Sequence, residues 1–375
     1  MLLNQGRIVK VKDGKIVIIA NNSGGLYDFR NDLMKELLQR NNEIVALTPF
    51  DNKVKELKQL GVQLISTPLN RRGINPIEDI KLFFKYCSIL KKESPNLVIT
   101  YTIKPNIYGG LASRVLRLSY AANITGIGTA FQKENFVKKL VVFLYKLALK
   151  KAKAVFFENQ GNLKLFVQEK IVKQDTCCLL NGAGVNLEEF LYKPYPTNED
   201  IHFLFMGRIM KEKGIDELLW AARKIKEEYP TVQFDILGNM EDDYQDIIGK
   251  AIDEGIINYY GYQSDVRPFI EKCHCFVLPS YHEGMANTNL ESAATGRPII
   301  TSNIHGCKEA VIENVSGYLV EKANSEELYQ KIKQFLELSF EEKAKMALES
   351  RKHMEHVFDK KKVVGCTIKT LNEAE

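Results

Sequence analysis

Two carboxylates, Glu283 and Glu291, have the type and spacing to take part in chemistry. They follow the short apolar run Cys275–Leu278, which predicts a buried strand, and a helix is predicted from about Thr288. The turn from a strand into a helix presents unpaired N–H groups and suits an anion. Carboxylates beside such a turn cannot bind phosphate, so we expect them to accept hydrogen bonds from sugar hydroxyls. The alternative is a solvated loop acid and an ordinary helix acid.

A second chemical segment is the loop GRIMKEKG, Gly207–Gly214, which follows the predicted strand His202–Met206. Arg208 and Lys213 are separated by five positions within a turn that has glycine at both ends, so both can converge on one diphosphate. Such contacts matter most where negative charge grows on a departing nucleoside diphosphate. The alternative is that the lysines of this loop are solvated.

In combination, these segments resemble the retaining glycosyltransferases of the family 4 type. The resemblance rests on the GRIMKEKG loop together with Glu-Gly at 283–284, Glu291 eight positions after Glu283, and Gly296-x-Pro298. The resemblance runs over nearly the whole chain and is greatest to the bacterial branch that builds cell-surface or lipid-linked glycans. It implies an α/β fold of the GT-B type, with two Rossmann-like domains that face each other across a cleft. We expect an acceptor-side domain over 1–190, after an extension of about 14 residues. We expect a nucleotide-sugar domain over 191–358, and a helix over 359–375 that crosses back to the first domain.

The resemblance also implies roles for individual residues. Glu283, Arg208 and Lys213 would be catalytic. Donor-binding positions would be Glu291, Gly284, Met285, Ala286, Asn287, Gly207, Gly238, Tyr262, Gly24 and Gly25. In this reading Glu291 binds the ribose hydroxyls, and Glu283 positions the donor sugar.

Acceptor contacts are predicted for Lys104, Arg72 and Thr129. The two basic residues lie where the carboxyl edge of the first sheet opens, although a solvated surface is the alternative. Many relatives have a donor-contacting histidine in the first domain, but the first histidine here is His202, so no general base is assigned. In a front-face retaining transfer the leaving phosphate can take the acceptor proton.

No metal ion or cofactor is expected. Glu241-Asp-Asp243 is not the Asp-x-Asp metal motif of the other glycosyltransferase fold. Cys273-His-Cys275 with His282 could be drawn as a zinc site. However, a Cys-x-Cys within a strand sends His274 to the opposite face, which favours plain packing.

Composition narrows the class of protein. The chain has 375 residues, 45% of them hydrophobic and 26% charged, which suits two soluble α/β domains. No run of 18 apolar residues and no apolar leader is present. Seven cysteines without framework spacing indicate a reducing compartment. We therefore expect a cytoplasmic protein, peripheral on the inner face of the cytoplasmic membrane if it contacts lipid.

The net charge of +5 conceals an asymmetry. Residues 1–185 hold 29 Lys and Arg against 14 Asp and Glu, whereas residues 186–375 hold 23 against 33. A basic first half suggests that this half meets an anionic surface or acceptor. Nucleic acid is disfavoured because no recognised nucleic-acid motif accompanies the charge.

One segment predicts a membrane contact. Within 131–154, Lys139, Lys146, Lys150 and Lys153 fall within roughly 60° of a helical wheel. A basic amphipathic helix can lie on an anionic leaflet, and a core helix with a solvated lysine face is the alternative.

Strands and helices alternate along the rest of the chain, which predicts parallel sheets. In the first half we expect strands at Lys15–Ala20, 43–48, 62–66, 97–101 and, as the last one, 155–157. The predicted function is transfer of a hexose or N-acetylhexosamine from a UDP-sugar to a glycan acceptor, in the manner of capsule or lipopolysaccharide assembly. Alternatives are a UDP-sugar 2-epimerase and a non-catalytic nucleotide-sugar-binding subunit. A nicotinamide-dependent oxidoreductase is disfavoured because no GxGxxG follows the first strand.

Overall fold

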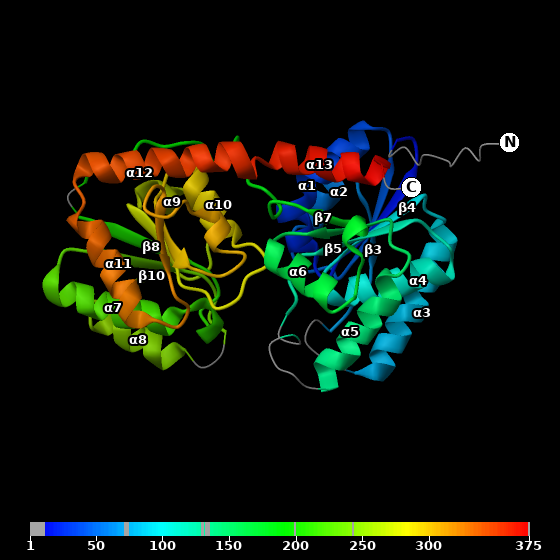
Figure 1. The fold of residues 1–375 in the computed structure, drawn as a ribbon, viewed down its shortest axis with the longest axis horizontal. Helices are drawn as coiled ribbons and strands as arrows, with labels where there is room; N and C mark the ends of the chain where they lie inside the picture. Colours follow the sequence, from blue (N-terminus) through cyan, green and yellow to red (C-terminus); the bar gives the residue numbers. More distant parts are fainter. Residues whose placement is uncertain are drawn as a thin grey trace. The chain divides into compact units, whose positions relative to one another are not determined.

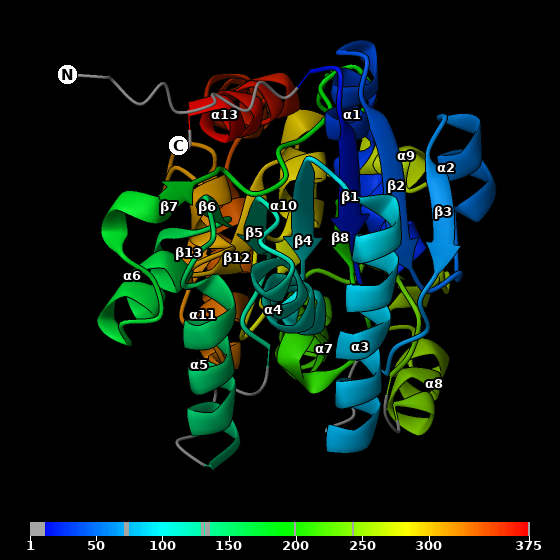
Figure 2. The ribbon, with the colours of Figure 1, turned by 90° about the vertical axis from the view of Figure 1, so that its right-hand side faces the viewer.

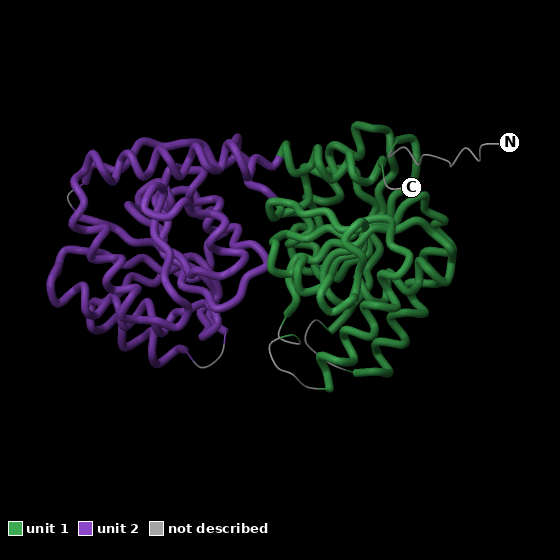
Figure 3. Tube along the Cα trace, in the orientation of Figure 1, with its two compact units in different colours: residues 1–183, 361–375 green, residues 184–360 purple. Residues whose placement is uncertain are grey.

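The computed structural model describes residues 12–70, 75–128, 131, 136–198, 200–241 and 244–373. The chain forms two compact units, residues 1–183 with 361–375 and residues 184–360 (Figure 3). The sequence patterns place the divisions after residues 190 and 358.

Unit 1 contains a parallel sheet of seven strands in the order β3-β2-β1-β4-β5-β6-β7. Its strands are β1 (Lys15–Ile19), β2 (Glu43–Thr48), β3 (Gln63–Ser66), β4 (Leu97–Tyr101), β5 (Tyr120–Ile124), β6 (Ala154–Phe157) and β7 (Cys177–Leu179). The order reverses between β1 and β4, which pair in parallel from Ile16 against Leu97. Ligands of such sheets bind outside the carboxyl ends of the strands at a reversal of this kind.

Alternation along the strands divides the interior of unit 1 into two cores. In β1, Ile16 and Ile18 face one core, and Val17 and Ile19 face the other. Both faces are covered, so the strands are apolar at nearly every position. The first core is closed by α1 (Ser23–Gln39), α2 (Val54–Gln59) and α13 (Lys360–Glu373). The second is closed by α3 (Pro76–Glu93), α4 (Gly110–Val115), α5 (Phe136–Leu149) and α6 (Gln160–Gln168).

The starts of these helices follow from local sequence. The Asn75 side chain accepts from the Ile77 N–H at 3.1 Å, and Pro76 occupies the first turn of α3, where no N–H is needed. A π-helical turn, η1 (Pro105–Gly109), precedes α4. A short 3-10 turn, η3 (Gln174–Thr176), precedes β7.

Unit 2 repeats the architecture with six parallel strands in the order β10-β9-β8-β11-β12-β13. They are β8 (His202–Met206), β9 (Gln233–Leu237), β10 (Asn258–Tyr259), β11 (Cys275–Leu278), β12 (Ile299–Ser302) and β13 (Gly317–Val320). The order again reverses, here between β8 and β11, so the carboxyl ends of these two strands form the expected ligand edge.

The helical elements of unit 2 follow their strands (Figure 1). They are η4 (Lys211–Lys213), α7 (Ile215–Glu228), α8 (Gln245–Asp253), α9 (Arg267–Lys272), α10 (Asn287–Ala294), η5 (Lys308–Ala310), α11 (Ser325–Glu337), α12 (Phe340–His353) and η6 (Met354–Phe358). Ser339 and Glu342 form a reciprocal capping box at the start of α12. After η6 the chain enters α13, whose Val363, Ile368 and Leu371 are buried in the first core of unit 1. The predicted return of the last helix to the first domain is therefore confirmed.

Two strands of unit 1 are absent from the sequence prediction. β5 is the run YAANI, in which alanines replace the branched residues that mark a strand, although all five residues are buried. β7 is three residues long and only half-buried. The prediction that 155–157 is the last strand of this sheet is wrong, because β7 pairs in parallel with β6.

Candidate active site

Glycines bring the loops at the carboxyl edge of the unit 2 sheet together. Gly238 follows β9 with a φ of 141°, and a Cβ built on it would lie 1.8 Å from the carbonyl oxygen of Gly207, which follows β8. The Gly207 N–H donates to the Leu237 carbonyl at 3.0 Å, and the Gly238 N–H donates to the Gly261 carbonyl at 2.8 Å. No larger residue fits at Gly238, so glycine is required there for the two loops to meet, and its donor-binding role stays a prediction.

A second close approach carries Lys213 to the end of β11. Gly214 ends η4 with a φ of 73°, and a Cβ there would lie 2.1 Å from the Pro279 carbonyl oxygen. The Tyr281 N–H donates to the Glu212 carbonyl at 2.8 Å, which joins the same two loops. The GRIMKEKG loop and the loop that contains Glu283 are therefore held against each other by backbone contacts.

The structure brings Lys213 and Glu283, which are 70 positions apart, into direct contact. The Lys213 Nζ forms an ion pair with Glu283 Oε1, and the Ser280 Oγ donates to the same oxygen at 2.8 Å. Only 18% of the Lys213 side chain and 11% of the Glu283 side chain are exposed. Within the described part of the chain both contacts use Oε1, so Oε2 is available to accept from a ligand hydroxyl.

Arg208 lies at the same edge but in water. Its Nη1 donates to Glu241 Oε2 at 2.8 Å, and 48% of the Arg208 side chain is exposed. A guanidinium group has five N–H donors, so this contact leaves the others for an anion. From the sequence, Glu241 was considered only as part of a metal motif. Its position just after β9, at the carboxyl edge of the sheet, is the signal that could have identified it as a partner of Arg208.

The loop over residues 284–287 is more buried than the sequence suggests, and one of its N–H groups is already hydrogen-bonded. Met285 and Ala286 are buried, and the Ala286 N–H donates to the Gly306 carbonyl at 2.7 Å. That N–H is therefore not available to a phosphate, and the donor-binding role of Ala286 stays a prediction. Asn287 begins α10, and its Oδ1 is buried without a hydrogen-bond partner among the described residues. Asn287 thus keeps an unused acceptor at the helix start.

The remaining donor-side positions of unit 2 lie nearby in the chain. Gly284 is the first residue of this loop, and Glu291 is half-buried on α10, one turn beyond Asn287. Tyr262 follows β10 and is 66% exposed, while the Tyr259 hydroxyl donates to the Gly238 carbonyl at 2.8 Å. Their roles stay predictions.

In unit 1, the N-terminus of α1 is already occupied by side chains. Asp51 Oδ1 accepts from the Ser23 N–H at 2.9 Å and from the Gly24 N–H at 3.2 Å, and Asn22 Oδ1 accepts from the Gly25 N–H. Burial alone would raise the pKa of Asp51, but hydrogen bonds from the Ser23 hydroxyl and from backbone N–H groups lower it. Gly24 and Gly25 can therefore approach a ligand through their Cα atoms, but their N–H groups are engaged.

The acceptor positions divide into two kinds. The Lys104 Nζ pairs with Asp79 Oδ1 at 2.7 Å, and both side chains are largely buried, so an acceptor phosphate would have to compete with Asp79. Arg72 and Thr129 lie outside the described residues.

Sequence reasoning missed a buried ion pair at the carboxyl edge of the unit 1 sheet. Arg30 on α1 pairs with Glu158, which directly follows β6, and the Arg30 guanidinium lies 4.7 Å from the ring centroid of Tyr101 at the end of β4. The Tyr101 hydroxyl is buried and has no partner in the described part of the molecule. The sequence contained one signal for Glu158, which is a carboxylate that directly follows a predicted strand. Asp51, which lies shortly after another predicted strand, had a similar signal.

The zinc alternative finds no geometric support. Cys273 and Cys275 are buried, and His274 Nδ1 accepts from the His202 N–H at 3.1 Å. Within the described ranges, no group of three or more His, Cys, Asp or Glu side chains is arranged to hold a metal ion. Metal independence of the reaction stays a prediction.

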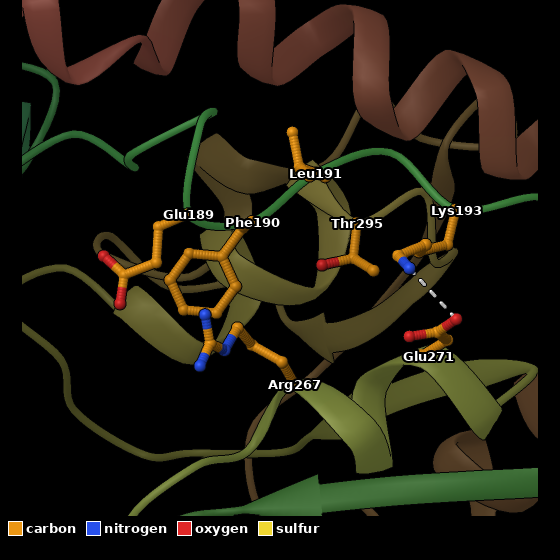
Figure 4. Close-up of a pocket in the computed structure, with 7 residues that line it drawn as sticks. All are labelled: Glu189, Phe190, Leu191, Lys193, Arg267, Glu271 and Thr295. Carbon is orange, nitrogen blue, oxygen red and sulfur yellow. Dashed lines mark ion pairs between the residues drawn. The ribbon is translucent and has the colours of Figure 1, made fainter.

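Unit 2 also has a surface pocket, whose lining side chains are drawn in Figure 4. Its lining is Glu189, Phe190, Leu191, Lys193, Arg267, Glu271 and Thr295, and it includes the Lys193–Glu271 ion pair at 3.2 Å. Glu271 and Thr295 each lie four positions before a strand, so the pocket borders the amino edge of the sheet. None of the predicted site residues lines it.

Among the described residues, no helix has both the length and the apolar character to cross a bilayer.

Known proteins share this sequence and architecture. Residues 189–353 match the family described as glycosyl transferases group 1, and residues 15–159 match the family described as glycosyl transferase 4-like. A solved structure of Anabaena Alr3699/HepE in complex with UDP superposes with a TM-score of 0.78 at 18% identity, over 95% of this chain and 99% of that one.

Two curated relatives are similar over most of their length. The N,N'-diacetylbacillosaminyl-diphospho-undecaprenol alpha-1,3-N-acetylgalactosaminyltransferase of Campylobacter jejuni is 27% identical over 340 residues, which is 86% of this chain and 89% of the relative. The UDP-Gal:alpha-D-GlcNAc-diphosphoundecaprenol alpha-1,3-galactosyltransferase of Escherichia coli is 26% identical over 288 residues, 69% of this chain and 71% of the relative.

Two Rossmann-like units with parallel sheets define the GT-B fold, which is also the fold of the similar solved structure. Together the two family matches span both units, and the chain belongs to the group 1 and 4-like glycosyltransferases.

Proposed function

We propose that the chain transfers a hexose or N-acetylhexosamine from a UDP-sugar to a growing glycan on a lipid diphosphate, during surface-polysaccharide or glycoconjugate assembly. The names of the two curated relatives support this substrate class, because both describe transfer onto a sugar attached to diphospho-undecaprenol. The UDP-bound structure of HepE supports the fold that holds the donor.

The observation that carries the proposal is the contact between Lys213, Glu283 and Ser280 at the carboxyl edge of β8 and β11. It places a cation and a carboxylate side by side, as a reaction needs when a diphosphate leaves a sugar. The Lys213 ammonium has three N–H donors, so it can keep Glu283 and still bind a phosphate oxygen. Arg208 would add a second positive charge to the leaving diphosphate, where developing negative charge is stabilised most.

Glu283 has a different role. With Oε1 fixed by Lys213 and Ser280, its Oε2 would accept a hydroxyl of the donor sugar, and its negative charge would stabilise the oxocarbenium-like centre. Glu291 would accept the ribose hydroxyls of the nucleotide. Both roles use acceptor-only carboxylates, which suits ligand hydroxyls and not ligand phosphates.

We also propose that the transfer retains the anomeric configuration and needs no metal ion. The region 1–183 contains no histidine, which supports proton transfer from the acceptor hydroxyl to the leaving phosphate instead of to a protein imidazole. Lys213 and Arg208 would supply the charge that a metal ion supplies elsewhere.

The test follows UDP release from a series of UDP-sugars, with and without a diphospho-polyprenyl glycan acceptor in detergent. Release that needs one donor and the acceptor supports the proposal, and NMR of the anomeric proton of the product tests retention. Added EDTA should leave the rate unchanged. Donor turnover without acceptor would indicate an epimerase or a hydrolase, and UDP binding without turnover would indicate a binding subunit.

Matched variants test the site itself. Lys213→Met should lower kcat by about 10²–10³, the range typical for loss of one preorganised donor to a developing anion. Lys211→Met is the control, because Lys211 lies in the same loop, is exposed and forms no ion pair with another described residue. Equal rates for the two variants would refute the role of Lys213.

A further inference from the structure

Two cysteines of unit 1 meet where β7 and α13 lie side by side (Figure 2). The Cys178 Sγ on β7 lies 3.5 Å from the Thr370 Oγ1 on α13. Cys366 precedes Thr370 by four positions, so one helical turn places both side chains on the same side of α13. The Cys178 thiol is also hydrogen-bonded to Cys366. The two sulfur atoms are therefore neighbours, although their residues are distant in the chain.

The adjacent cysteine, Cys177, points the other way. Successive side chains of a strand alternate between the two faces of a sheet, so Cys178 packs against the first core and Cys177 against the second. The Cys177 Sγ donates to the Lys173 carbonyl at 3.2 Å. Burial raises the pKa of the Cys177 thiol to about 11. Cys177 is thus a matched control, because it differs from Cys178 mainly in the face of the strand that it occupies.

Both thiols of the pair can be reached from solvent. All seven cysteines belong to the described residues, and Cys366 is the exposed one among them, while Cys178 is half-buried. A surface cavity of about 200 Å³ is lined by Cys178 and Thr370. Lys153, which the sequence placed on a helix over 131–154, lies beyond the end of α5 and lines the same cavity. A small oxidant can therefore approach the pair both at Cys366 and through the cavity.

Two neighbouring thiols can bind a soft metal ion or form a disulfide. A structural zinc site has four ligands, and within the described ranges no third His, Cys, Asp or Glu joins this pair in an arrangement for a metal ion. Burial raises the pKa of the Cys178 thiol, a hydrogen bond from Thr370 lowers it, and the hydrogen bond to Cys366 raises it. The exposed Cys366 is therefore the thiol that meets an oxidant first.

We propose that Cys178 and Cys366 form a reversible oxidation site, at which a small disulfide such as oxidised glutathione converts the two thiols into one disulfide bond. The Cys366 thiolate attacks the small disulfide, forms a mixed disulfide and releases one glutathione thiolate. The Cys178 thiolate then attacks the Cys366 sulfur, which forms the protein disulfide and releases the second glutathione thiolate. The two protons of the protein thiols pass to the released thiolates, so two cysteines are oxidised and one glutathione disulfide is reduced. The exchange is reversible, so a reducing compartment restores the thiols.

The position of this bond gives it a structural consequence. The chain passes from unit 1 to unit 2 shortly after β7 and returns to unit 1 at α13. The two connecting segments are paired, because the Val185 N–H donates to the Phe358 carbonyl at 2.8 Å and the Lys360 N–H donates to the Val185 carbonyl at 3.0 Å. A Cys178–Cys366 disulfide would close a covalent ring that contains the whole of unit 2, and it would hold α13 on β7. The bond needs no substrate, so it is independent of the proposed function.

The test uses the full chain, which is reduced, treated with oxidised glutathione, blocked with N-ethylmaleimide and mapped by mass spectrometry of its peptides. We expect a disulfide-linked pair of peptides that contain Cys178 and Cys366, and dithiothreitol should separate them. Cys178→Ser and Cys366→Ser should each lower the yield of this link by at least about tenfold, because the exchange needs both sulfur atoms. Cys177→Ser is the control and should leave the yield unchanged.

Urea unfolding followed by circular dichroism gives a second readout. The oxidised chain should have a higher midpoint than the reduced chain, because a disulfide constrains the unfolded state, and Cys366→Ser should remove this difference. Circular dichroism spectra before oxidation establish that each variant is folded. Three results would overturn the proposal: no linked peptides from the unmodified chain, a link that persists in Cys178→Ser, or covalent dimers through Cys366 in place of the bond within one chain.

Discussion

Removal of either partner of the Lys213–Glu283 pair should destabilise unit 2, and removal of both should cost less than the two single changes together. Their side chains are 18% and 11% exposed. Loss of one partner from a fully buried pair costs about 3–5 kcal/mol, and exposed pairs contribute about 0–1 kcal/mol. We therefore expect Glu283→Gln and Lys213→Met each to lower the free energy of unfolding of unit 2 by about 2 kcal/mol. The double variant should also lose about 2 kcal/mol, which gives a coupling energy of about 2 kcal/mol.

The chain offers a specific probe for this measurement. It has one tryptophan, Trp220, which lies on α7 in unit 2, 6.4 Å from the ring centroid of Tyr329. Urea unfolding followed by tryptophan fluorescence therefore reports on unit 2. The control is the same set of two single variants and one double variant, a double-mutant cycle, at the Arg208–Glu241 pair. That pair is more exposed, at 48% and 28%, and should give a coupling energy below about 1 kcal/mol.

Strictly additive losses at Lys213 and Glu283 would contradict this expectation. Additivity would mean that the two charges are solvated independently. A coupling energy equal to that of the Arg208–Glu241 pair would also contradict the expectation, because the larger coupling energy at Lys213–Glu283 is expected only from the greater burial of that pair.

Three further predictions concern unit 2. Gly238→Ala should lower the free energy of unfolding by more than about 3 kcal/mol, since its Cβ would lie 1.8 Å from the Gly207 carbonyl oxygen. Gly249→Ala is the control: it lies in open space on α8 and should raise the free energy of unfolding by about 0.5–1 kcal/mol. The midpoints of urea unfolding compare the two variants. Burial lowers the pKa of His274 to about 4, below its ordinary value of 6.5, so the unfolded chain binds more protons between these values. Stability should therefore fall by up to about 3 kcal/mol as the pH drops from 6.5 towards 4, and His274→Asn should reduce this slope in urea titrations at several pH values. The Arg297 guanidinium donates to five backbone carbonyls, so Arg297→Lys should cost about 2–4 kcal/mol in thermal or urea unfolding, and a change below about 0.5 kcal/mol would contradict that role.

The sequence alone predicted the fold class, because alternating apolar strands and amphipathic helices leave few arrangements other than parallel sheets. It also led to the prediction that two loops of unit 2, Gly207–Gly214 and the loop with Glu283, carry the chemistry, and the structure shows that these loops are in contact. In GRIMKEKG the final glycine, Gly214, lies where one backbone comes close to another, at the Pro279 carbonyl oxygen. A side chain there would collide, so the position requires glycine. Such requirements are local, so they are visible in the order of residues.

Pairing between distant side chains was decided only by the tertiary structure. Nothing in the chain order shows that Lys213 contacts Glu283, or that Asp51 occupies the N-terminus of α1, where Gly24 and Gly25 are predicted to bind the donor. These contacts depend on which strands are neighbours, and the strand order is set by packing of the whole unit.

The same holds for α5. A period of 3.6 residues shows which side chains share a face, but it does not show which face is covered. Helix α5 is apolar on both sides, and only its packing against the sheet decides that Tyr145 is buried while Phe143 is exposed. The sequence therefore determined that the helix is amphipathic and basic, and the tertiary structure determined which surface it presents, because burial depends on neighbours that are distant in the chain.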